Sequence, residues 1–337
     1  MNFQPNALVR SRRAVTLAGV LALLLCHLSS PRAARGEDEP AGHPKAQPKV
    51  VHPFLDGLVG SWDVTMKAGG AEMKGGVRYG KEVDGTALLE DLHVGEGAAA
   101  FYGLGVMRPS EDGKTLKSWW FDTQGKGGMW PFEGPLTETG YDLKGDMAGT
   151  AATVSLHKKG SGYEFTMKVA DKVAATATYA KSAKERPWSR EAKATGKEPA
   201  IVQAELGDWT VEGSVMGQPH AGEAWFRLGL GGAYVLGGFE ASGHGPTRAS
   251  FTVSAVAADG KTMRTWAFGN YLPDPLVLEG AFAEGSWEGK GSTSMGDIRV
   301  ELKKADAGLT SATWFGSGSD AMQSGTETYT RKAAPGK

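Results

Sequence analysis

Side chains that commonly carry out chemistry are few and scattered in this chain. Six histidines follow residue 36, none at metal-ligand spacing, and no His-Glu-x-x-His sequence occurs. They are His43, His52, His93, His157, His220 and His244. A Gly-x-Ser-x-Gly nucleophile elbow is also absent from the sequence. We therefore expect no metal site and no serine hydrolase, and Glu90, Asp91 and Asp122 could form an acid–base pair only if the fold brings them together.

A more informative pattern lies in the aromatic stretch 117–122, which alternates as a strand does. One face carries Lys117, Trp119 and Phe121, and the other carries Ser118, Trp120 and Asp122. The later stretch 264–269 repeats the first face as Arg264, Trp266 and Phe268, but it has Ala267 and Gly269 on the second.

We interpret the repeated face as structural packing and the differing face as a candidate ligand site. Trp120 and Asp122 would line a cavity, and Trp130 and Tyr271, on the loops that follow, could rim a barrel mouth. The alternative is that Trp120 is an ordinary core residue and that Asp122 is a solvated strand end.

The elements that would position these residues belong to a domain that occurs twice in the chain. Gly60-Ser61-Trp62 returns as Gly207-Asp208-Trp209, and Asp112 to Trp119 returns as Asp259 to Trp266, both displaced by 147 positions. Short apolar runs bounded by Asp-Gly turns predict strands. Helices are expected only at Pro53 to Val59 and Ala200 to Leu206, each leading into a Gly-x-Trp strand. The sequence thus predicts an all-β fold with two tandem antiparallel barrels, over 53–182 and 200–332.

The remaining segments are assigned from composition. A basic stretch, an apolar run of 15 residues and a small-residue exit predict a secretory signal peptide over 1–36, too short to span a membrane, which needs about 20 residues. Residues 37–52 resemble a flexible leader, 183–199 a charged, proline-broken linker, and 333–337 a tail. We expect an exported protein, periplasmic or secreted. Lipid anchoring through Cys26 is disfavoured, because Leu25 is large where such a signal needs a small residue.

The balance of charged side chains and the number of cysteines restrict the classes of function that are possible. Removal of 1–36 would leave 32 basic against 38 acidic side chains and no cysteine. We therefore expect no nucleic-acid partner, no disulfide and no cysteine nucleophile.

The Gly-x-Trp start of each copy, with a basic residue on its last strand, resembles the lipocalin (calycin) superfamily. A closer resemblance is to lipocalin-like bacterial exported proteins of unknown function, which carry Trp-x-Asp after an Asp-Gly turn, here Trp120-Phe121-Asp122. The resemblance implies that Lys181 covers Trp62 and that Arg331 or Lys332 covers Trp209, closing each barrel. Haem-binding relatives use a histidine near the domain's end, and 174–181 and 324–332 have none, so no cofactor is expected.

Three functions remain open. The first is binding of a small apolar or amphipathic ligand in a barrel cavity. The second is an envelope or surface protein whose barrels are filled and whose outer faces bind a protein partner. The third, which we favour least, is a barrel enzyme acting on a small molecule.

Overall fold

The protein is described by a computed structural model. It describes residues 46–125, 127–188, 200–243, 245–283, 285–293, 296–306, 308–318 and 321–333. The expected signal peptide with Cys26, most of the leader, the later part of the linker and most of the tail lie outside the described residues.

The first copy is a closed barrel of ten antiparallel strands. Helix α1 (Pro53–Leu58) precedes it, and η2 (Gly97–Ala99) lies between its third and fourth strands. The strands are β1 (Gly60–Ala68), β2 (Ala71–Glu82), β3 (Ala87–Val94), β4 (Phe101–Pro109), β5 (Thr115–Asp122), β6 (Trp130–Thr137), β7 (Gly140–Met147), β8 (Thr150–Lys159), β9 (Gly162–Val169) and β10 (Lys172–Lys181). Each strand pairs with the next, and β10 closes on β1.

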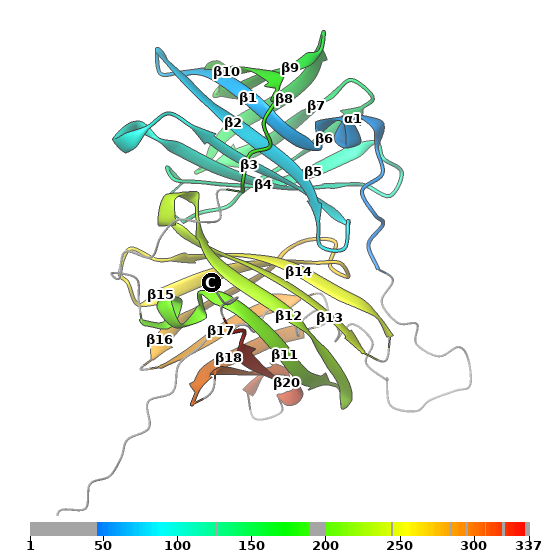
Figure 1. Ribbon diagram of the computed structural model, residues 1–337, viewed down its shortest axis with the longest axis vertical. Helices are drawn as coiled ribbons and strands as arrows, with labels where there is room; N and C mark the ends of the chain where they lie inside the picture. Colours follow the sequence, from blue (N-terminus) through cyan, green and yellow to red (C-terminus); the bar gives the residue numbers. More distant parts are fainter. Residues whose placement is uncertain are drawn as a thin grey trace, which may run out of the picture.

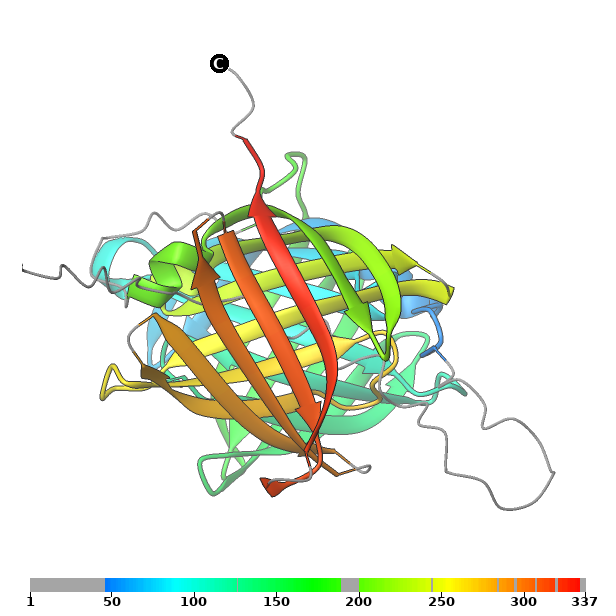
Figure 2. The same cartoon turned by 90° about the horizontal axis from the view of Figure 1, so that it is seen from below.

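The second copy repeats this architecture with ten further strands. Helix α2 (Ala200–Glu205) precedes it, and η3 (Leu230–Gly232) follows the second strand. The strands are β11 (Gly207–Val215), β12 (Gln218–Gly229), β13 (Tyr234–Gly243), β14 (Gly245–Val256), β15 (Thr262–Gly269), β16 (Leu276–Ala283), β17 (Ser286–Thr293), β18 (Gly296–Ala305), β19 (Gly308–Phe315) and β20 (Met322–Arg331). Figure 2 shows these strands (green to red) side by side and tilted around the barrel. The predicted fold, two tandem antiparallel barrels, is confirmed.

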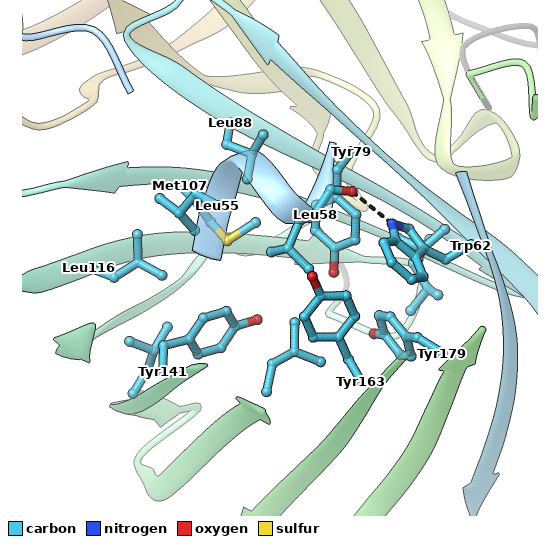
Figure 3. Packing of buried hydrophobic residues seen from close by; sticks show 14 of the residues in the cluster. Leu55, Leu58, Trp62, Tyr79, Leu88, Met107, Leu116, Tyr141, Tyr163 and Tyr179 are labelled. Carbon is cyan, nitrogen blue, oxygen red and sulfur yellow. Dashed lines mark hydrogen bonds between the residues drawn. The ribbon is translucent and has the colours of Figure 1, made fainter. Parts of the chain in front are cut away.

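Each short helix closes one end of its barrel. Phe54, Leu55 and Leu58 of α1 are buried in the core of the barrel. Figure 3 shows Leu55 and Leu58 among the barrel side chains. The Trp62 indole Nε1 donates a hydrogen bond to the Leu58 carbonyl at 2.7 Å, and Trp209 makes the same bond to Glu205 at 2.9 Å. We call this the helix end of each barrel and the opposite one the far end. Because the strands alternate in direction, the β1–β2, β3–β4 and β5–β6 turns lie at the far end.

The stretch just before α1 is packed against the barrels. Val50 is fully buried, its amide donates to the Gly85 carbonyl, and its own carbonyl accepts from the Lys81 ammonium. The Gln47 amide donates to the Asn270 carbonyl of the second copy. The described part of the expected flexible leader, residues 46–52, is therefore held by burial and hydrogen bonds.

The two barrels pack side to side through the face that both copies share. Trp119 and Phe121 on the outer face of β5 meet Trp266 and Phe268 on the outer face of β15. The Trp119 and Phe268 ring centroids lie 5.4 Å apart, and those of Phe121 and Trp266 lie 5.2 Å apart. Figure 1 shows β4 and β5 facing β14 and β15 across this junction. We call this set of buried outward side chains the interface cluster.

A buried arginine also links the copies. Arg108 on β4 donates from Nη2 to the Gly269 carbonyl at 3.0 Å and from Nη1 to the Leu272 carbonyl. Burial lowers the pKa of this guanidinium to about 10, with the nearby Asp274 carboxylate opposing the shift, so the side chain remains charged at neutral pH. Two carbonyl oxygens of the second copy thus accept charge-assisted hydrogen bonds from an arginine of the first copy.

Candidate functional site

The candidate residue Trp120 faces the interior of barrel 1. Its ring lies against β4, where a Cβ atom at Gly103 would come within 2.2 Å of the ring and one at Gly105 within 3.4 Å. These two glycines therefore provide the space that the indole occupies. The second copy has Ala267 in place of Trp120, and Ser250 and Thr252 in place of the glycines. Barrel 1 thus has a large side chain on β5 beside two glycines on β4, whereas barrel 2 has a small side chain on β15 beside two larger residues on β14.

Asp122 positions other groups rather than facing solvent. One carboxylate oxygen accepts from the Trp120 indole Nε1 at 3.0 Å, and the other accepts from the amides of Gln124 and Gly125 at 2.8 and 2.6 Å. The carboxylate thus caps the β5–β6 turn and orients Trp120. Trp130 is the first residue of β6, not a loop residue as expected, and pairs in register with Trp120. The structure therefore brings Trp120, Asp122 and Trp130 together.

Tyr271 lies apart from these three. It occupies the β15–β16 turn at the far end of barrel 2, where it is buried in that barrel's own core. Its neighbours Asn270 and Leu272 bond to the first copy.

The far end of barrel 1 presents apolar side chains that point inward yet remain partly exposed. Alternation from the buried interior residues directs them into the barrel. They are Met73, Phe101, Trp130, Met147 and Val169. At the helix end, by contrast, Leu55, Leu58, Leu88 and Leu116 are fully buried. Barrel 1 is therefore closed by α1 at one end, whereas these five side chains, which we call the apolar mouth, remain partly exposed at the other.

Between these ends lies a buried carboxyl group that sequence analysis could not place. Glu90 on β3 faces inward, whereas the adjacent Asp91 faces outward, because neighbouring strand residues point to opposite faces. Burial raises the pKa of Glu90 to about 7, with the Tyr79 hydroxyl opposing the shift in part. Tyr79, Tyr141 and Tyr179 direct their hydroxyls into the same interior (Figure 3), and burial raises the pKa of each well above its usual value. No sequence motif marks this group, since its members come from separate strands.

The four barrel-closing residues meet in two pairs. The Lys181 ammonium lies 4.3 Å from the Trp62 ring centroid, and the Arg331 guanidinium lies 4.5 Å from that of Trp209. Lys181 also donates to the Val59 carbonyl at 3.0 Å, and Arg331 donates to the carbonyls of Leu206 and Ala204. Each cation thus joins the last strand of its barrel to the segment that enters the first.

We expect Lys181→Met to lower the free energy of unfolding by about 1 kcal/mol, because it removes an exposed cation–π contact and one hydrogen bond while keeping the alkyl stem. Urea denaturation measures this change. Lys67→Met is the control, since Lys67 makes only an exposed ion pair with Glu72 at 3.6 Å. Equal losses in both variants would contradict a closing role for Lys181.

A surface cleft of about 390 Å³ lies at the helix end of barrel 1, between residues 48–53, the β4–β5 turn and Glu138. Among the described residues, no three His, Cys, Asp or Glu side chains are grouped to hold a metal ion. In the same part of the chain, no helix has the length and apolar character to cross a membrane.

Fold and site together define a tandem β-barrel protein with two closed ten-stranded barrels. Lipocalin barrels have eight strands, so the resemblance to that superfamily does not extend to strand number. No family model and no curated protein matches the chain. One solved structure that is similar to this chain is that of a protein of unknown function from the DUF3598 family of Nostoc punctiforme. It is 9% identical, the match covers 83% of this chain and 98% of that chain, and the TM-score is 0.24.

Proposed function

We propose that this protein is exported and binds a small apolar or amphipathic ligand in the mouth of barrel 1. The supporting observation is the set of large apolar side chains that point inward at the far end and remain partly exposed. Burial of apolar surface is favourable, so a ligand that removed the remaining exposed surface of these side chains from water would be bound with a gain in free energy. The indole of Trp120, held by Asp122, would form the floor of this mouth, and the Glu90 carboxyl would be the polar group below it.

The test is native mass spectrometry of the protein purified under non-denaturing conditions. We expect a retained small molecule and a polypeptide mass that lacks residues 1–36. Trp120→Ala should release the ligand or weaken its binding at least about tenfold. Trp314→Ala is the matched control, because Trp314 stacks under Arg299 at 3.9 Å on the outer face of barrel 2. Ligand retention in Trp120→Ala, or equal loss in both variants, would count against the proposal.

A barrel enzyme is the second candidate, and one observation favours it. A carboxyl group with a pKa of about 7 can both donate and accept a proton near neutral pH. Glu90 would then be the acid–base group for a substrate that enters from the far end. The interaction-protein alternative gains less support, because the apolar outer face shared by both copies is already used between the barrels.

A further inference from the structure

The interior of barrel 2 is polar where that of barrel 1 is apolar. Strand register identifies the corresponding inward positions near the far ends. Met73, Phe101, Phe165, Met167 and Ala177 of barrel 1 correspond to His220, Arg248, Ser311, Thr313 and Glu327 of barrel 2. Several large apolar side chains are thus replaced by charged groups or small hydroxyls, which changes both the polarity and the filling of the interior.

Some of these polar groups satisfy one another. The His220 Nε2 lies 3.0 Å from a Glu327 carboxylate oxygen, and the two side chains are only 3% and 0% exposed. The Tyr329 hydroxyl donates to the other Glu327 oxygen, and the Ser311 hydroxyl lies 3.4 Å from it. The carboxylate is therefore surrounded by hydrogen-bonding groups from three strands, which offset its charge within the barrel.

Other polar atoms in the same interior remain unsatisfied. In the described part of barrel 2, four interior atoms have no hydrogen-bond partner: His220 Nδ1, Arg248 Nη1, Ser250 Oγ and Thr313 Oγ1. Thr313 is 0% exposed and Ser250 is 4% exposed. Arg248 faces inward because it pairs with Ala241, a residue of the barrel core. Buried polar groups without partners are costly, so a ligand that bonded to these four atoms would stabilise the folded barrel.

We propose that the far end of barrel 2 binds a small polar molecule that carries an anionic group, a carboxylate or a phosphate. The Arg248 guanidinium would supply the positive charge and the fork of donors that such groups prefer. The His220 Nδ1 and the hydroxyls of Thr313 and Ser250 would complete its hydrogen bonds. This site is separate from the apolar mouth of barrel 1, so the two barrels bind ligands of different chemistry.

Isothermal titration calorimetry tests this with inorganic phosphate, acetate and succinate as probes. We expect at least one probe to bind with a submillimolar Kd, and Arg248→Met to weaken that binding by about tenfold or more. Thr313→Val should also weaken it, because valine keeps the shape and removes the hydroxyl. Arg227→Met is the matched control, because it removes the same charge from the outer face of barrel 2, where Arg227 pairs with Asp208 at 2.7 Å.

Circular dichroism and the urea midpoint establish that each variant folds. Should Arg248→Met fail to fold, Arg248→Lys keeps the charge without the fork and should give a smaller loss of affinity. Three results would overturn the proposal: no probe binds at millimolar concentration, Arg227→Met weakens binding as much as Arg248→Met, or a crystal structure grown in phosphate shows only water on the four atoms.

Discussion

Phe121→Ala should lower the free energy of unfolding by about 3–5 kcal/mol, the range for removing a fully buried phenylalanine. Phe121 is 0% exposed, and its ring centroid lies 6.0, 5.2 and 6.3 Å from those of Tyr234, Trp266 and Phe268. All three partners belong to the other barrel, so the loss falls on the contact between the barrels. Urea denaturation followed by far-ultraviolet circular dichroism measures it.

A double-mutant cycle separates this contact from general damage to barrel 1. Phe121→Ala and Trp266→Ala together should destabilise by less than the sum of the single changes, because both remove one edge-to-face pair. The weakened junction should also divide calorimetric unfolding into two transitions, one for each barrel. A single-variant loss below about 1 kcal/mol, or strictly additive effects, would mean that the interface cluster does not hold the barrels together.

Glu90→Gln should stabilise the protein at alkaline pH, by about 3 kcal/mol at pH 8 and by about 1 kcal/mol or less at pH 5. The folded pKa of Glu90 is about 7 against an ordinary value of 4.5, and one unit is about 1.4 kcal/mol. Since the folded state holds the proton more tightly, the wild type is stabilised by protonation at low pH. It loses this stability as pH rises from about 4.5 through 7. Glutamine stays neutral and removes the dependence.

Urea midpoints at pH 5 and pH 8 measure this effect, and infrared spectroscopy adds a direct signal. The carbonyl band of a protonated carboxyl group should disappear with a midpoint near pH 7 in the wild type and be absent from Glu90→Gln. Glu223→Gln is the control: this exposed carboxylate pairs with Lys332, and its loss should change stability by less than about 1 kcal/mol at either pH. A pH-independent difference between Glu90→Gln and wild type would exclude a raised pKa.

Much of the architecture can be predicted from local sequence. The constant offset between the copies reveals the duplication, and short alternating runs with Asp-Gly turns indicate strands. Gly113 and Gly260 have φ values of 69° and 63°, the left-handed conformation that such turns require. Gly-x-Trp marks the strand that each short helix enters. These features can be predicted from sequence because each depends on residues that lie close together in the chain.

Alternation also places Trp119 and Phe121 on the face opposite Trp120 and Asp122, but it does not say which face points into the barrel. That depends on how ten strands close and on which outer face the second copy covers. The same limit applies to Glu90 and to the pair of His220 and Glu327, which are 107 positions apart. Residues this distant meet only through strand pairing and barrel closure, and their burial, which sets the pKa of Glu90, follows from that closure.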